Sequence, residues 1–423
     1  MRISGYISPV VLLTAWLMAV TAGPAPAGVV RTAPGSGDGA LSRAIAAAAG
    51  GDTVVVAAGM YREYGILVTS PLYITGEGHA IVDAGGDGEI FTVFSPGVTI
   101  RGLELRNVGT SFMEDRAAIK VEGASGCTVE DNLIVNAFFG VYLANVEGCR
   151  VRRNEIRGKA ERESTSGNGI HLWHCRDITV EDNTVTGHRD GIYFEFVNDS
   201  RITGNHSEGN LRYGLHFMFS FDDEYVNNVF IKNGAGVAVM YSSGVSMVNN
   251  RFERNWGGAS YGLLLKEIKD SEIRGNYFHL NTIAIYSEGS NRLKVTGNEF
   301  VSNGYAVKIM ANSMENEFTG NNFRGNTFDV STNSRQNFNT FRANYWSGYR
   351  GYDLDGDGVG DVPYHPVRLF SLLVEKQPAG VILMNSLFVG IIDAAERVMP
   401  VFTPETLVDA GPLIEAVGID GRH

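Results

Sequence analysis

Side chains with the chemistry of soft-metal ligands recur along one part of the sequence, at intervals of roughly 22 residues. Thioether and imidazole groups together suit copper, and the soft methionine sulfur favours Cu(I). The candidate ligands of a transient copper site are His216, Met218 and Met240, with His171 and Glu195 as weaker neighbours. The same side chains, beside Trp173 and Tyr193, also fit an apolar patch that docks a protein partner. The residues alone leave both possibilities open.

A second group of metal-binding residue types lies near the end of the chain. Its carboxylates alternate with other residues and with glycines, and they belong to Asp353, Asp355, Asp357 and Asp361. This order matches the start of a calcium-binding loop. Tyr364 occupies the place where an EF-hand needs its bidentate glutamate, so the EF-hand is incomplete. We expect either a structural Ca²⁺ at a terminal cap or a plain acidic turn.

A repeat must position these side chains. Its strands begin with a small residue followed by an aliphatic one, as in Gly191-Ile192 and Gly214-Leu215. Since side chains alternate across a strand, the aliphatic columns face a core while the candidate copper ligands face outward. Insertions at 159–166 and 255–260 interrupt the spacing on either side of these ligands and are expected to form loops that frame the face.

An asparagine closes the next strand of each repeat. Asparagine tolerates left-handed turns and can form stacked ladders, so its recurrence is structural. The series is Asn132, Asn154, Asn183, Asn205, Asn228, Asn250, Asn276, Asn298 and Asn321 or Asn322. Together, these columns predict an all-β fold, a right-handed parallel β-helix of about ten rungs with a short helical C-terminal segment.

The chain divides into four segments. Residues 1–27 have the charge, apolar run and small residues of a cleaved secretory signal, so we expect a periplasmic protein. The others are the β-helix with its N-terminal cap (28–344), an Asp-rich C-terminal cap loop (345–369) and a docking segment (370–423).

The docking segment contains an apolar stretch. Its apolar run at 379–392 is interrupted by Asn385 and Ser386 and is shorter than the ~20 apolar residues of a membrane span. We expect residues 379–398 to contact the bilayer interface or a membrane subunit. The alternative is a helix packed on the last rung.

The composition narrows the function classes. With 35 Lys and Arg against 47 Asp and Glu, the formal charge is −12, which argues against nucleic-acid binding. No G-x-x-x-x-G-K-[ST] motif is present, so ATP energy must come from another subunit. The three cysteines lack any C-x-x-C spacing. Cys127 and Cys149 are expected to stack as small apolar residues inside the helix.

Several segments resemble the NosD family. They are GIYFEF at 191–196, NLRYGLHFMFS at 210–220, NGAGVAVMY at 233–241, NYWS at 344–347 and RVMPVFTPET at 397–406. The resemblance implies a periplasmic component of an ABC-type complex that matures the copper centres of nitrous oxide reductase. It implies four partners: a membrane permease, its cytoplasmic ATPase, a copper chaperone and the apo-reductase. Carried over to this sequence, it places transient copper on the candidate ligands named above, although a sulfur species is an alternative cargo.

Two other function classes compete. Parallel β-helices also serve as polysaccharide lyases, epimerases and hydrolases, and Asp190, Glu195, Asp222 and Asp223 are close enough in register for carboxylate chemistry. Exposed methionines have no role in sugar chemistry, so we expect no enzyme. The other alternative is a metal-free scaffold that recruits partners through the outward patch.

Overall fold

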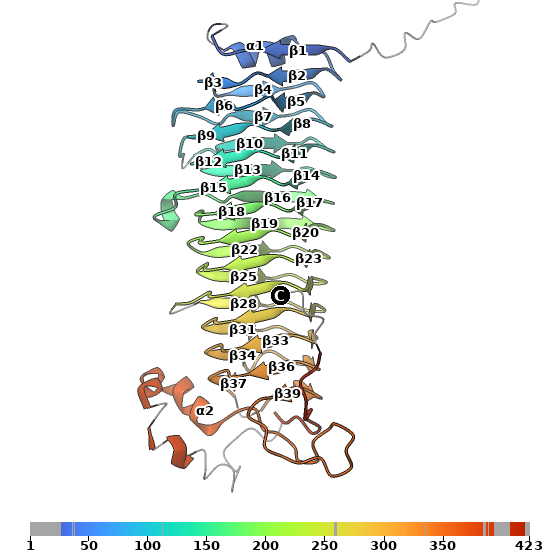
Figure 1. Ribbon diagram of the computed structural model, residues 1–423, viewed down its shortest axis with the longest axis vertical. Coiled ribbons are helices and arrows are strands. Elements are labelled where there is room, and N and C mark those ends of the chain that lie inside the picture. The colour runs from blue at the N-terminus through green and yellow to red at the C-terminus, as the bar shows by residue number, and fades with distance from the viewer. Residues whose placement is uncertain are drawn as a thin grey trace, which may run out of the picture.

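The computed structural model describes residues 27–418 except 36, 38, 112, 258–259, 335, 384–385, 388 and 393–406. It is a parallel β-solenoid in which three sheets run along the length of the molecule (Figure 1). The predicted signal peptide lies almost wholly outside the described residues. Within them, no helix is long and apolar enough to cross a membrane.

Each turn of the chain contributes one strand to each sheet. The first sheet contains β1 (Val29–Thr32), β2 (Thr53–Val56), β5 (Tyr73–Gly76), β8 (Thr99–Arg101), β11 (Thr128–Glu130), β14 (Arg150–Arg152), β17 (Thr179–Glu181), β20 (Arg201–Thr203), β23 (Glu224–Val226), β26 (Ser246–Val248), β29 (Glu272–Arg274), β32 (Lys294–Thr296), β35 (Glu317–Thr319) and β38 (Thr340–Arg342). The second contains β3 (Gly59–Tyr61), β6 (Ala80–Asp83), β9 (Glu104–Arg106), β12 (Leu133–Val135), β15 (Glu155–Arg157), β18 (Thr184–Thr186), β21 (His206–Glu208), β24 (Val229–Ile231), β27 (Arg251–Glu253), β30 (Tyr277–His279), β33 (Glu299–Val301), β36 (Asn322–Arg324) and β39 (Tyr345–Trp346).

The third sheet carries the candidate copper ligands, and we call it the site sheet. Its strands are β4 (Ile66–Val68), β7 (Phe91–Val93), β10 (Ala117–Glu122), β13 (Phe139–Ala144), β16 (Ile170–Arg176), β19 (Asp190–Asn198), β22 (Tyr213–Met218), β25 (Ala235–Met240), β28 (Tyr261–Lys266), β31 (Ile283–Glu288), β34 (Tyr305–Ile309) and β37 (Phe328–Thr332). The helical elements are α1 (Ala40–Ala47), the 3-10 turn η1 (Glu163–Thr165), α2 (Leu369–Lys376) and the 3-10 turn η2 (Pro378–Leu383).

The class of fold is the one predicted, but the predicted number of rungs, about ten, is too low. Within the described residues the first sheet alone has 14 strands. The missed rungs lie mainly before Ala118, where β1 to β9 supply strands without the recurring glycine and asparagine markers. Only short apolar alternations mark those strands, and a strand of three or four residues gives little periodic signal.

The inward columns form one continuous core. Ile192, Leu215 and Val237 pair in register on successive site-sheet strands and are fully buried. Opposite them, a column of aromatic rings lies 4.1 to 5.5 Å apart from centroid to centroid. This column consists of Phe230, Phe252, Phe278, Phe300, Phe323 and Trp346. The alternation of buried and outward side chains therefore sets which residues the outer face can use.

The predicted asparagine series forms a buried ladder. The Oδ1 of Asn228 accepts hydrogen bonds from both the backbone N–H and the Nδ2 of Asn205, at 2.9 and 3.0 Å, and the same pattern repeats along the stack. Of the two residues left open by the spacing, Asn321 is the ladder member. A second ladder, which the sequence analysis missed, contains Asn210, Asn233, Asn255, Asn281, Asn303 and Asn326.

The C-terminal segment returns to the solenoid after α2 and η2. Asp409 closes the first ladder, because its carboxylate accepts hydrogen bonds from the backbone N–H and Nδ2 of Asn344 and from the indole N–H of Trp346. Asp409 and Leu413 also form isolated parallel bridges with Phe341 and Tyr345. Residues after the Asp-rich loop thus cover the open end of the last rung.

Candidate functional site

Two outward columns of the site sheet hold the candidate copper ligands. Glu195, Met218 and Met240 are register partners on β19, β22 and β25, so the two methionines occupy neighbouring rungs. His216 precedes Met218 by two residues on β22 and therefore points from the same face. The register predicted from the sequence is the observed one, and it brings two thioethers and one imidazole onto adjoining positions.

The environment of His216 differs from the exposed one predicted. Its side chain is only 5% exposed, and both ring nitrogens are buried without a hydrogen-bond partner among the described residues. The rings of Tyr213 and Tyr193 cover it at centroid distances of 4.7 and 5.0 Å. Burial lowers the pKa of His216 to about 4, so the imidazole is neutral near pH 7, as metal coordination requires.

His171 makes more contacts with its neighbours than His216 does. Its ring lies between the rings of Tyr142 and Tyr193, at 4.6 and 4.7 Å, and its Nδ1 lies 2.9 Å from the Nδ2 of Asn168. Burial lowers its pKa to about 3. Because one nitrogen and both ring faces are occupied, His171 is placed to support the face rather than to reach an ion outside it.

The remaining candidates lie closer to solvent. Met218, Met240 and Glu195 are half-buried, and Glu195 accepts a hydrogen bond from the hydroxyl of Tyr193 at 3.2 Å. That bond and the neighbouring carboxylate raise the pKa of Tyr193, although burial is the larger cause. The structure therefore joins Glu195 to the aromatic cover of His216 through one tyrosine.

The carboxylates that suggested sugar chemistry have other roles. Asp190 is fully buried and accepts hydrogen bonds from Nε and Nη2 of Arg212 one rung away. Asp223 is buried in a turn, where its Oδ1 accepts the N–H of Ser200. Asp222 is exposed at the outer corner next to it. These residues do not form an open pair of carboxylates across a groove, which glycoside hydrolysis needs.

A partly exposed stack of aromatic rings lies next to the methionines and was missed at the sequence level; His174 and Phe196 are exposed, and Phe219 and Tyr241 are half-buried. It consists of His174, Phe196, Phe219 and Tyr241, which follow Trp173, Glu195, Met218 and Met240 in the chain. The signal was present, because aromatic residues recur there at the repeat length. We call this stack the aromatic ladder.

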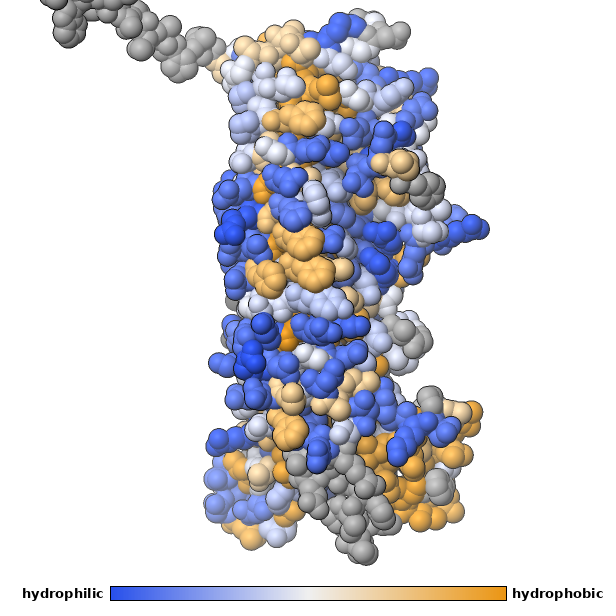
Figure 2. Space-filling view, turned by 180° about the vertical axis from the view of Figure 1, so that it is seen from behind, coloured by the Kyte–Doolittle hydropathy of each residue, from blue (hydrophilic) through white to orange (hydrophobic). Residues whose placement is uncertain are grey.

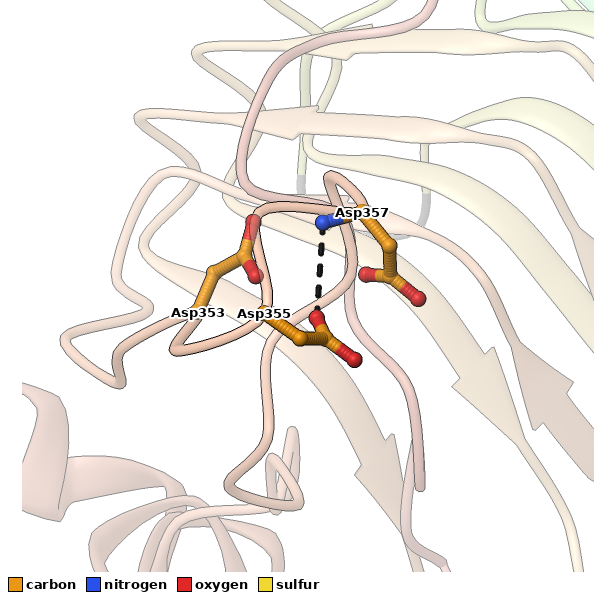
Figure 3. Close-up of side chains that lie close together, drawn as sticks. All are labelled: Asp353, Asp355 and Asp357. Carbon is orange, nitrogen blue, oxygen red and sulfur yellow. Dashed lines mark hydrogen bonds between the residues drawn. The ribbon is translucent and has the colours of Figure 1, made fainter.

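Three of the four predicted calcium ligands come together. Carboxylate oxygens of Asp353, Asp355 and Asp357 lie within 4.8 Å of one another, and Figure 3 shows the three side chains around one loop. Asp353 also accepts the N–H groups of Gly356 and Gly358 at 2.7 and 2.9 Å. Asp361 is not part of this group; its Oδ2 accepts the N–H of Leu354. The loop geometry alone thus accounts for Asp353 and Asp361 as turn residues.

The described part of the predicted docking segment packs by one side and exposes the other. Phe370, Val374 and Val389 form one buried cluster with Phe328 of the last site-sheet strand. Large apolar side chains on the other side are exposed, and Ile382 and Leu387 reach 87% and 82%. The exposed set is Leu373, Ile382, Leu383, Leu387 and Ile391, and hydrophobic side chains gather at this end of the molecule in Figure 2. Residues 393–398 of the predicted contact stretch lie outside the described residues.

The three parallel sheets define the class of this protein, a parallel β-solenoid. A solved structure of this class, the catalytic unit of an α-1,3-glucanase from Streptomyces thermodiastaticus, superposes with a TM-score of 0.57 at 17% identity. The superposition covers 78% of this chain and 68% of the glucanase chain. At that identity the likeness shows the fold alone.

Sequence relatives define the family. The chain is 33% identical to the "Probable ABC transporter binding protein NosD" of Pseudomonas aeruginosa, over 87% of this chain and 89% of the relative. It is 29% identical to the protein of the same name from Stutzerimonas stutzeri, over 82% and 84%. Residues 153–351 match the family described as "Periplasmic copper-binding protein (NosD)". The chain belongs to the NosD family, and the matched region includes every strand that carries a candidate copper ligand.

Proposed function

We propose that this chain is a periplasmic accessory protein that accepts copper on the site sheet and relays it, on an ABC-type permease complex, for the maturation of nitrous oxide reductase. The observation that carries the proposal is the pairing of Met218 with Met240 on adjacent rungs beside His216. Adjacent strands are ~4.8 Å apart, so two thioether sulfurs can approach one ion. The family's description as periplasmic and copper-binding supports the same conclusion.

The state of His216 fits a transient site. Burying an imidazole without hydrogen bonds costs free energy unless a ligand supplies the missing contacts. Neither ring nitrogen of His216 has a hydrogen-bond partner among the described residues. A ligand nitrogen becomes accessible when Tyr213 or Tyr193 moves away from the ring. Two thioethers and one imidazole leave a position for a ligand from a partner, which suits copper that must be released again.

The C-terminal segment supplies the contact with the membrane complex. Its inner side anchors it to β37, while its outer side presents Ile382, Leu387 and Ile391 to solvent. Large exposed apolar patches mark interaction sites. The names of the relatives point to an ABC transporter as the partner. We further propose a copper chaperone as the donor, the apo-reductase as the acceptor and a cytoplasmic ATPase as the source of energy.

A competitive Cu(I) titration of the purified chain tests the copper proposal. We expect one bound Cu(I), with affinity at least tenfold weaker in His216→Ala and in the double variant Met218→Ala/Met240→Ala. Met314→Ala is the matched control, because Met314 is an exposed methionine on a later rung. Absence of Cu(I) binding in the parent, or unchanged affinity in the double variant, would refute the proposal.

The burial of both histidines favours one second candidate, a metal-free docking scaffold. On that hypothesis Trp173, Met218 and the tyrosine cover only contact a partner, and the parent binds no Cu(I) in the same titration. Catalysis is not part of either proposal, since Asp190 is held by Arg212. Turnover of uronic-acid polymers that Asp190→Asn abolishes would contradict this.

A further inference from the structure

The aromatic ladder spans four successive rungs on the outer corner between the site sheet and the first sheet. The ring centroids of His174 and Phe196 are 4.6 Å apart, those of Phe196 and Phe219 5.3 Å, and those of Phe219 and Tyr241 5.1 Å. The rings are nearly parallel, with interplanar angles of 10° to 16°. Figure 2 shows hydrophobic side chains grouped near the middle of the long axis, at the height of these rungs.

The backbone under the ladder is left-handed. The φ angles of the four residues lie between 51° and 57°, a region that bulky residues avoid. The same corner holds Gly123, Asn145 and Gly289 on other rungs. Glycine and asparagine adopt this conformation at little cost, so the turn itself does not require aromatic residues. Glu267 has the same φ, 53°, at this corner one rung further on, so the left-handed turn belongs to the coil and only the choice of aromatic side chains is particular to the ladder.

The ladder exposes ring edges rather than ring faces. Phe196 is stacked on both faces, by His174 and Phe219, and is still 38% exposed, so its exposed area must be the edge. A sugar would need a free ring face, which the two middle rings do not offer. Ring edges carry partial positive charge, and thioether sulfur packs favourably against them.

The residues around the ladder also favour a partner that presents thioether groups. Met218 and Met240 directly precede Phe219 and Tyr241, so the ladder adjoins the proposed copper face. A carboxylate flanks the ladder on each side: half-buried Glu195 on one and exposed Asp222, three residues after Phe219, on the other. Asp199, three residues after Phe196, is already paired with Arg176 at 2.9 Å. This rim favours a partner segment that carries positive charge.

We propose that the aromatic ladder is the docking strip for a methionine-bearing, positively charged segment of the protein that delivers copper. The segment lies along the ring edges, and its thioethers stand beside Met218 and Met240 for transfer. This inference rests on the proposed function for the identity of the cargo, whereas the recognition of thioethers by the ladder can be measured without copper.

The probe is a fluorescein-labelled Met-Lys-Met-Lys-Met peptide, whose alternating side chains place methionines on one face when extended. Its control is the same peptide with norleucine, which replaces each sulfur by a methylene and keeps length and charge. We expect the full chain to bind the methionine peptide at least tenfold more tightly than the norleucine peptide, with copper removed by a chelator.

The test variant is Phe196→Asn/Phe219→Asn, because asparagine suits the left-handed corner and Asn145 already occupies it. We expect it to unfold at a temperature no lower than the parent and to bind the methionine peptide at least tenfold more weakly. Phe338→Asn, at an exposed phenylalanine outside the ladder, should bind like the parent.

Equal affinity of the parent for both peptides, no binding, or unchanged binding by the double variant would overturn the inference. A Cu(I) titration of the same proteins separates this failure from that of the proposed function. Selective peptide binding in a parent that binds no Cu(I) would support the ladder and refute the copper relay.

Discussion

The clearest pH-dependent feature of this protein is the buried carboxyl group of Asp223. Its Oδ1 accepts the N–H of Ser200 at 2.9 Å, while its Oδ2 is buried without a partner among the described residues. Desolvation raises the pKa of Asp223 from 3.8 to about 8, and the nearby charges of Asp199 and Asp222 add to the effect. The folded protein therefore keeps this group protonated at neutral pH.

The sign of the effect on stability follows from proton linkage. Between pH 3.8 and about 8, the folded state holds a proton on Asp223 that the unfolded state has released. The free energy of unfolding then falls as the pH rises through this range. At about 1.4 kcal/mol per pH unit, the loss between pH 5 and pH 8 is at most about 4 kcal/mol, because relaxation and water entry reduce it. The neutral side chain in Asp223→Asn removes this dependence.

Urea unfolding at pH 5, 6.5 and 8 measures the effect. We expect the unfolding midpoint of the parent to fall more steeply with pH than that of Asp223→Asn, so that the variant is the more stable protein at pH 8. Asp222→Asn is the matched control, because Asp222 is the exposed neighbouring residue, and its profile should keep most of the parent's slope. Parallel profiles for the parent and Asp223→Asn would refute the reasoning.

Three further predictions concern the framework of the site. Asn228→Ala leaves buried ladder amides without partners and should lower the free energy of unfolding by about 3 kcal/mol, measured by urea unfolding; a loss below 1 kcal/mol would contradict the ladder's role. Asp190→Asn removes the buried carboxylate that pairs with half-buried Arg212 and should cost about 3 kcal/mol in the same assay without changing Cu(I) affinity in a chelator competition. If the Asp-rich loop binds Ca²⁺, millimolar Ca²⁺ will raise the melting temperature of the parent but not of Asp355→Asn/Asp357→Asn, whereas an equal response of both proteins would indicate a plain acidic turn.

The sequence predicted the register of the site better than the extent of the fold. The pairing of Met218 with Met240 followed from the two-residue alternation within strands and the repeat between them, and the structure has the same pairing. The rung count failed because β1 to β9 lack the markers from which the repeat was recognised. The second asparagine ladder was missed although Asn210 and Asn233 follow the same spacing as the first.

The environment of the histidines could not be predicted in this way. The alternation places His171 and His216 on the outer face, where side chains are ordinarily exposed to solvent. Whether an outward ring is buried depends largely on rings from neighbouring rungs: Tyr142 and Tyr193 are 22 to 29 positions away in the chain from the histidines they cover, and only Tyr213 is on the same strand as His216. Tyr142, Tyr193 and Tyr213 turn these two exposed positions into buried ones.

Residue spacing is enough to predict the parallel solenoid, its core columns and the grouping of thioethers and imidazoles on one face. A period of two along a strand and a constant repeat length fix the direction of each side chain. Residue spacing does not predict that His216 is neutral and covered, that Asp190 is held by Arg212, or that Asp409 closes the asparagine ladder. These properties depend on contacts between rungs and on the return of the chain end. Burial and charge pairing are set by packing in three dimensions, and no local pattern of residue types specifies them.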